Sequence, residues 1–232
     1  MAERWRGGLQ VGFSSDLREK AASIWAAEKR HPFVTGIGDG SLALEKFRFY
    51  MRQDYIFLVE FSRAVSLAVA KAQDIEDMGW FARLLHETLN TEMALHVGFC
   101  GDFGITEEEL RKTAPSPTTH AYTRHLMQTA YSGRAGDIAA AILPCSWGYC
   151  EIGQMLFRQG PPPDQPLYAK WIEMYNSPEL AELAEWLRSF VDRTARASSS
   201  GEVARMEEIF LTSSRYEYMF WDAAYRLEEW PV

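Results

Sequence analysis

Cysteine is scarce in this sequence: Cys100, Cys145 and Cys150 are the only cysteines among 232 residues. Such a small and odd number excludes the disulfide framework of a small secreted protein. The three residues also lack the paired spacing of a structural zinc site. We therefore expect a protein of a reducing compartment, the cytoplasm.

Long apolar runs and clusters of basic residues are also missing. No stretch approaches the roughly 18 uncharged apolar residues of a membrane span, and residues 1–10 lack the apolar centre of a signal peptide. The 24 basic and 32 acidic residues give a net charge of −8 and a pI near 5.2, without a dense Lys/Arg block to neutralise phosphates. The sequence therefore predicts neither a membrane partner nor a nucleic-acid partner.

Alternating apolar and polar runs typical of strands are almost absent. Most of the chain instead repeats its apolar residues at the helical period of 3.6, which predicts an all-α fold. Glycines at 36, 38 and 40 predict a turn. No joint differs enough in composition to separate two cores, so we expect an N-terminal extension over 1–12 and one domain over 13–232. The expected helices are about 15–29, 44–73, 76–100, a short one after Thr106, 118–131, 137–158, 167–175, 178–196 and 202–229.

A carboxylate interrupts the apolar stripe of the helix over 44–73. The stripe includes Phe47, Leu58 and Phe61, and Asp54 occupies the position seven residues after Phe47. An isolated buried charge is costly, so Asp54 should have a partner, be protonated, or face a polar cavity. The alternative is that Asp54 caps or braces a neighbouring helix.

The helix over 202–229 contains a second inward carboxylate. Glu217 falls at helical spacing into the stripe that includes Phe210, Phe220 and Ala224. Taken alone, Glu217 could be a structural hydrogen-bonding residue. Two inward carboxylates on helices distant in sequence favour a shared polar pocket.

A cysteine follows the proline inside the helix over 137–158. Pro144 removes one helical hydrogen bond and its ring collides with the preceding turn, so we expect a kink or break beside Cys145. A thiol at a kink can face a cavity, and Tyr149 lies one turn later on the same face. The alternative is that Cys145 is a buried small hydrophobe, which is the interpretation for Cys100 and Cys150.

Glu92-x-x-x-His96 places a carboxylate and an imidazole on one helical face, as in half of a di-iron site. Such a site needs a second set of ligands, and the other four histidines do not lie in a clear inward Glu-x-x-His motif. The pattern alone is therefore weak evidence for a metal.

Several blocks, in the same order, resemble the TenA/thiaminase II family of helical proteins with the haem-oxygenase-like fold. The resemblance covers about residues 13–230 and implies a single-domain haem-oxygenase-like helical bundle. It also favours a reactive Cys145 over a structural one. The blocks are His31-Pro32-Phe33-x-x-Gly36-Ile37-Gly38-Asp39-Gly40, Gln53-Asp54, Glu92-Met93-x-x-His96, Ser116-Pro117-Thr118, Leu143-Pro144-Cys145-x-Trp147-x-Tyr149-x-Glu151 and Ser213-Ser214-x-Tyr216-Glu217-Tyr218-x-Phe220-Trp221.

This resemblance implies a hydrolase of thiamine salvage. Its substrate would be 4-amino-5-aminomethyl-2-methylpyrimidine, with thiamine as an alternative, and cleavage of the methylene C–N bond would give hydroxymethylpyrimidine. Cys145 matches the family's nucleophile, Glu217 its proton donor, and Asp54 the carboxylate that binds the amino and ring-nitrogen edge. The scheme requires no metal or organic cofactor, and the family implies a homotetramer. The remaining residues expected to contact the substrate are Phe57, Tyr122, Tyr149 and Tyr175.

Phe57 departs from the family pattern, in which a tyrosine at this position approaches the catalytic thiol and raises its nucleophilicity. Phenylalanine can stack on the ring but cannot donate that hydrogen bond, so a slower enzyme or a shifted substrate choice is expected. The choice between thiamine and an aminomethyl- or formylaminomethyl-pyrimidine stays open. The alternative function is a haem-oxygenase-like di-metal oxidase with the ligands Glu92, His96, Glu217 and Asp54.

Overall fold

The computed structural model describes residues 12–102 and 104–232, and this part of the chain contains helices and no strands. The prediction of an all-α fold is therefore confirmed. Residues 1–11 of the expected N-terminal extension lie outside the described residues. The helices are α1 (Phe13–Lys20), α2 (Ala22–Lys29), α3 (Pro32–Asp39), α4 (Leu44–Lys71), α5 (Ile75–His86), the π-helix η1 (Glu87–Glu92), α6 (Met93–Asp102), α7 (Glu107–Lys112), α8 (Pro117–Ser132), α9 (Ala135–Gln159), α10 (Pro166–Tyr175), α11 (Pro178–Ala197) and α12 (Ser200–Arg226).

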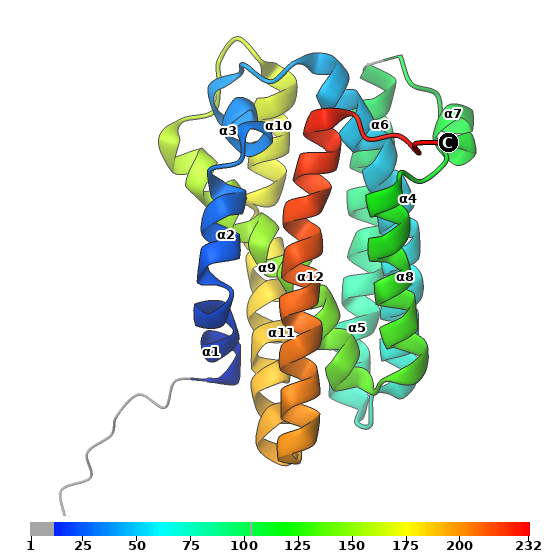
Figure 1. Cartoon of the computed structure of the whole chain (residues 1–232), viewed down its shortest axis with the longest axis vertical. Helices are drawn as coiled ribbons and strands as arrows, with labels where there is room; N and C mark the ends of the chain where they lie inside the picture. Colours follow the sequence, from blue (N-terminus) through cyan, green and yellow to red (C-terminus); the bar gives the residue numbers. More distant parts are fainter. Residues whose placement is uncertain (1–11, 103) are drawn as a thin grey trace, which may run out of the picture.

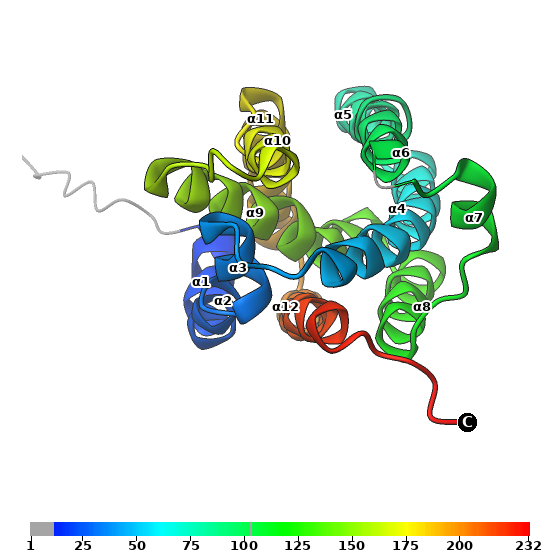
Figure 2. The same cartoon turned by 90° about the horizontal axis from the view of Figure 1, so that it is seen from above.

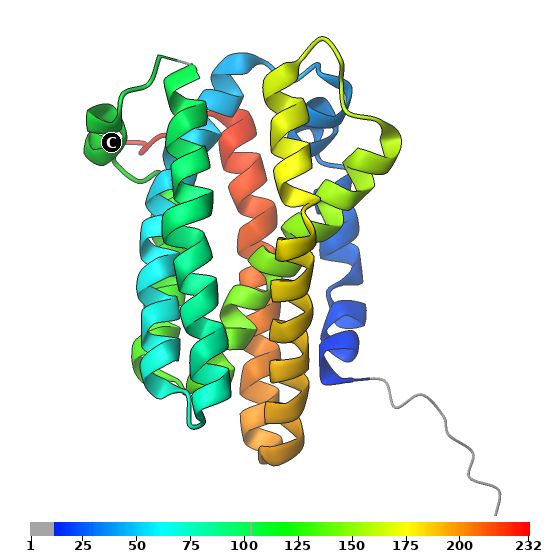
Figure 3. The ribbon, with the colours of Figure 1, turned by 180° about the vertical axis from the view of Figure 1, so that it is seen from behind.

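The long helices run roughly along one axis, with α12 at the front and α4 and α8 to one side of it (Figure 1). Seen from above, α9 crosses the middle of the molecule between α12 and the α10–α11 pair (Figure 2). From behind, α5 with α6 and α10 with α11 form two long columns (Figure 3). Because α9 packs against α12, α11, α10, α8 and α4, side chains on several of its faces point into the core.

The apolar core joins residues from Leu17 to Ala224. Trp25, Trp171 and Trp221 are almost fully buried in it, and burial of each large side chain contributes roughly 2–3 kcal/mol or more. No helix in the described ranges is both long and apolar enough to cross a membrane. Polar side chains buried inside this apolar core therefore need a structural or functional reason.

The segment predicted to be a glycine turn is helix α3, so this prediction is wrong. His31 caps the helix, its Nδ1 accepting the Phe33 N–H at 3.1 Å, and only Gly40, at φ 78°, leaves the helical conformation. Gly36 serves close packing instead of turning: a Cβ there would lie 3.0 Å from the Leu42 Cβ. Gly36 therefore allows a close contact, and Gly40 caps the C-terminal end of the helix.

Three other expected elements differ in detail. The helix predicted over 15–29 is divided at Ala21, whose ψ of 3° interrupts the regular helix. The helix predicted over 76–100 contains the π-helix η1. Of the kink or break expected at Pro144, the break does not occur, since α9 continues through the proline despite its cost of roughly 3 kcal/mol. The short helix expected after Thr106 is α7, which begins with a capping box of Thr106 and Glu109.

Candidate active site

A small buried cavity, the inner cavity, lies between α4, η1, α9 and α10. Its volume is about 30 Å³, enough for a few water molecules at most, so lining side chains must move to admit a ring. It brings together five of the residues predicted from the sequence, namely Asp54, Phe57, Cys145, Tyr149 and Tyr175. The other lining residues are Leu58, Phe61, Leu84, Thr88, Glu92, Ser146 and Leu180.

The two remaining predicted residues, Tyr122 and Glu217, contact each other next to Phe57. The Phe57 and Tyr122 ring centroids are 5.0 Å apart, and the Tyr122 hydroxyl donates a hydrogen bond to Glu217 Oε1. Neither residue lines the inner cavity. The charge of Glu217 nevertheless acts on Cys145, so the acid to which the family resemblance assigns proton donation lies near the thiol.

Glu217 carries a proton at neutral pH. Its side chain is buried on α12, and this burial raises the pKa of the carboxyl from 4.5 to about 8. The hydrogen bond from Tyr122 lowers the pKa and the charge of Asp54 raises it, but burial has the larger effect. A protonated carboxylic acid in this position can act as a general acid.

Cys145 is a neutral thiol in this environment. The side chain is partly exposed to the cavity, one residue after Pro144 on α9. Burial of the sulfur raises its pKa well above the usual value, and the nearby Glu217 carboxylate raises it further. Glu92 and Asp54 act in the same direction. A positive charge brought into the cavity would therefore favour the thiolate.

Asp54 points inward from α4 without a full set of hydrogen bonds. The side chain is 3% exposed, and its Oδ2 lies 3.4 Å from His96 Nε2. Neither of these two atoms makes a hydrogen bond within the described residues. Of the alternatives given by the sequence, a nearby partner applies, namely His96, and Asp54 also lines the mostly apolar inner cavity.

Aromatic side chains form one wall of the inner cavity. The Tyr149 ring lies 4.8 Å from Tyr175 and 4.9 Å from Trp221, and Trp171 lies 4.6 Å from Tyr175. The Tyr175 hydroxyl donates to Glu92 Oε1 at 3.1 Å. This wall consists of aromatic rings inclined at 33–55° to one another, with a polar edge at the Tyr175 hydroxyl, and suits an aromatic heterocycle.

The π-helix keeps one face of a long column directed at the cavity. Leu84, Thr88 and Glu92 line the cavity, and His96 contacts Asp54. In a straight α-helix, residues spaced four apart are rotated by about 40° relative to one another about the helix axis. Four residues at this spacing would therefore not all face the cavity. The wider π-turn compensates for part of this drift, as π-turns at functional sites commonly do.

The proposed metal ligands of the alternative function do not assemble. Glu217 is bonded to Tyr122 and Glu92 to Tyr175, while Asp54 and His96 face each other. Across residues 12–102 and 104–232, no group of three or more His, Cys, Asp or Glu side chains is arranged to hold an ion. The geometry does not favour a di-metal centre.

Sequence reasoning missed Glu28 on α2. The side chain is 3% exposed, its Oε1 has no hydrogen-bond partner in the described structure, and burial raises its pKa to about 9. The charge of Glu217 contributes to this shift, which places Glu28 near the site. Its spacing after Leu17, Ala21 and Trp25 continues a buried helical face and could have revealed it.

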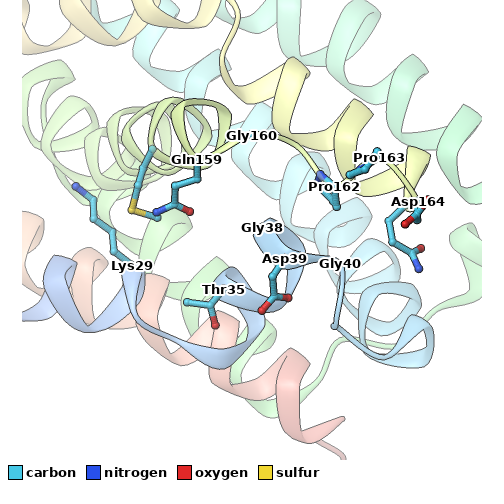
Figure 4. Close-up of a pocket in the computed structure, with 12 residues that line it drawn as sticks. Lys29, Thr35, Gly38, Asp39, Gly40, Gln159, Gly160, Pro162, Pro163 and Asp164 are labelled. Carbon is cyan, nitrogen blue, oxygen red and sulfur yellow. The ribbon is translucent and has the colours of Figure 1, made fainter.

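A larger hollow of about 670 Å³ lies away from these residues, at the surface between α3 and the loop after α9. Figure 4 shows Thr35 and Asp39 on one side of it and Gln159, Pro162 and Pro163 on the other. None of the seven predicted site residues lines it. The candidate active site is the smaller, buried cavity.

Comparison with known proteins shows to which family the chain is similar. The profile of the TENA/THI-4/PQQC family matches residues 18–227. An aminopyrimidine aminohydrolase of Halalkalibacterium halodurans is 46% identical over 220 residues, which are 95% of this chain and 98% of that protein.

Similarity to solved structures shows the fold. A TenA homologue from P. horikoshii OT3 superposes with a TM-score of 0.85 at 32% identity, covering 93% of this chain and 99% of that one. A domain with a heme oxygenase-like fold from Shewanella denitrificans has a TM-score of 0.73 at 14% identity, covering 92% of each chain, and supports the fold alone. The fold is haem-oxygenase-like, and the chain belongs to the TENA/THI-4/PQQC family.

Proposed function

We propose that the protein is an aminopyrimidine aminohydrolase of thiamine salvage. It would hydrolyse the methylene C–N bond of 4-amino-5-aminomethyl-2-methylpyrimidine, and more slowly that of thiamine, to release hydroxymethylpyrimidine. The observation that carries the proposal is the meeting of Cys145 and Asp54 in one aromatic-walled cavity, with protonated Glu217 close enough to act on the thiol. The naming of a relative with 46% identity supports the same reaction.

Binding would begin at Asp54. The carboxylate accepts hydrogen bonds from the amino group and the protonated ring nitrogen of the pyrimidine, which gives the buried charge the partner that it lacks. Tyr149 and Tyr175 pack on the ring. The cationic ring also offsets the carboxylates that raise the pKa of Cys145, so binding promotes the thiolate.

Chemistry would then proceed in two halves. The Cys145 sulfur forms a bond to a ring carbon, and the displaced electron pair expels the amine from the exocyclic methylene as Glu217 donates its proton. Water next adds to the methylene and gives a proton to the Glu217 carboxylate. The S–C bond breaks, which restores the aromatic ring and the thiolate that entered the reaction. Atoms and protons balance without a metal or an organic cofactor.

Phe57 supplies no hydroxyl to the thiol, so activation depends on the substrate's charge in this proposal. Phe57 packs instead against Tyr122, Phe61 and Phe220. A slower reaction than that of a protein with tyrosine at this position is the expected consequence.

The test is direct. Purified protein is incubated separately with the aminomethylpyrimidine, the formylaminomethylpyrimidine and thiamine, and hydroxymethylpyrimidine is quantified by chromatography. We expect the aminomethylpyrimidine to have the highest kcat/KM. Failure of all three to yield hydroxymethylpyrimidine would refute the proposed function.

We also propose a homotetramer over a domain of residues 13–232. Large apolar side chains on the surface support association, among them Ile75, Tyr131 and Phe157. Light scattering during size-exclusion chromatography tests the tetramer. The free catalytic thiol fits a reducing compartment such as the cytoplasm.

A further inference from the structure

Glu92 is unused by the reaction above, although it lines the inner cavity. It ends the π-helix and accepts the hydrogen bond of the Tyr175 hydroxyl. Part of the residue reaches a second, shallower depression of about 90 Å³, the outer hollow, which shares Leu84, Thr88 and Leu180 with the inner cavity. Glu92 thus lies at the boundary of the site and outside the tightly packed core.

The hydrogen bond fixes the direction of the Tyr175 hydroxyl. Burial raises the pKa of Glu92 to about 7, so above this pH the side chain is a carboxylate that can only accept, and the proton of Tyr175 lies on the line to Glu92, 3.1 Å away. The phenolic oxygen keeps its lone pairs for other partners. The hydroxyl can then accept a hydrogen bond from a ligand but cannot donate one.

The aromatic wall contains a second hydrogen bond whose direction is fixed. The Trp171 indole N–H, which can only donate, points to the Tyr50 hydroxyl at 3.3 Å. Tyr50 therefore accepts this hydrogen bond, and its hydroxyl also interacts with those of Tyr149 and Tyr175. The described hydrogen bonds thus make Tyr50 an acceptor from Trp171 and Tyr175 a donor to Glu92.

Hydrogen-bond acceptors at this edge of the cavity match an amino-pyrimidine. Asp54 and Tyr175 both present acceptors to the inner cavity, so a ligand with an amino group and a protonated ring nitrogen is satisfied there. An oxo group at the same ring position would place its oxygen against acceptors and would leave buried lone pairs unpaired.

We propose that Glu92 is a positioning residue that holds the Tyr175 proton away from the cavity and thereby makes the site select an amino-pyrimidine over its oxo counterpart. The inference rests on the proposed function, since it concerns recognition of the same pyrimidine. It assigns to Glu92 a role in specificity and no direct part in bond breaking.

The experiment measures binding, so it does not depend on turnover. Calorimetric titrations compare 4-amino-5-hydroxymethyl-2-methylpyrimidine with its 4-oxo analogue, and the ratio of their Kd values is the readout. Glu92→Met removes the acceptor at similar length, and Tyr175→Phe removes the hydroxyl. Glu87→Met is the matched control, because Glu87 lines only the outer hollow from the same π-helix.

We expect Glu92→Met to reduce the preference for the amino compound by about 10-fold or more, the scale of one mispaired buried hydrogen bond. Tyr175→Phe should reduce the preference to a similar extent, and the double variant should show no further loss, because Glu92 acts through Tyr175. Glu87→Met should retain the wild-type ratio.

Other outcomes overturn the inference. A Glu92→Met protein that binds both compounds more weakly by the same factor would show that Glu92 only stabilises the structure. Additive effects in the double variant would show that Glu92 does not act through Tyr175. If Glu92→Met does not fold, an unchanged ratio in Tyr175→Phe overturns the inference by itself. Wild-type protein that binds neither compound would refute the proposed function, and the inference with it.

Discussion

Replacing Glu217 by Gln should stabilise the protein at neutral pH, although it removes the proposed general acid. Folding raises the pKa of this carboxyl from 4.5 to about 8, chiefly by burial. Between these two pH values the folded state binds more protons than the unfolded state, so stability falls as pH rises through this window. Gln imitates the protonated acid and does not titrate.

The expected size follows from the pKa shift. Between the unfolded pKa of 4.5 and pH 7 lie about 2.5 pH units, and the wild type loses roughly 1.4 kcal/mol of stability in each. The raised pKa of Glu217 thus lowers the free energy of unfolding by about 3 kcal/mol at pH 7. At pH 4.5 the penalty is nearly absent. The oxygen of the introduced amide can still accept the hydrogen bond of Tyr122, whereas the new amide N–H groups carry a desolvation cost that is independent of pH.

The assay is urea unfolding of wild type and Glu217→Gln at pH 4.5, 6, 7 and 8. The difference in unfolding free energy should move in favour of the variant by about 3 kcal/mol between pH 4.5 and pH 7. Glu208→Gln, an exposed change on the same helix, should show no such trend. A difference that stays constant across this range would refute the claim that Glu217 is protonated in the folded protein.

Three further changes test other parts of the site. Glu28→Gln should raise the unfolding free energy by up to about 3 kcal/mol at pH 7 and by little at pH 4.5, in the same urea assay, because burial raises the pKa of Glu28 to about 9. Asp54→Asn should weaken hydroxymethylpyrimidine binding by roughly 1.5–3 kcal/mol in calorimetric titrations. Unchanged affinity with a large loss of melting temperature would make Asp54 a brace. Phe57→Tyr should raise kcat by about 2- to 10-fold in steady-state assays by placing a hydroxyl near the thiol; a fall in kcat would contradict this reason.

The inward carboxylates could be predicted from the sequence because helical periodicity fixes which residues face the core. Asp54 and Glu217 are both buried where the stripe placed them, at 3% and 4% exposure. Family resemblance added Tyr149 and Tyr175, which line the cavity with Cys145. Glu28 obeys the same periodicity, but a charged residue near a helix end is usually assigned to solvent.

Other features depend on contacts that periodicity does not encode. Helix α3 retains Gly36 because Leu42 packs against its backbone, a contact between segments that the sequence pattern shows only as glycine. The π-helix arises without proline or glycine, within residues 87–92. The approach of His96 to Asp54 then follows from this local change of pitch, which no residue type indicates.

Turnover of the aminomethylpyrimidine by Cys145→Ser tests the central claim most directly. Serine retains the shape but is a far weaker nucleophile at neutral pH, so release of hydroxymethylpyrimidine should fall to background while binding of this product persists. Cys150→Ser, a buried change on the same helix, should retain activity. A near-normal rate in Cys145→Ser, or loss of activity only in Cys150→Ser, would contradict the assignment of Cys145 as the nucleophile.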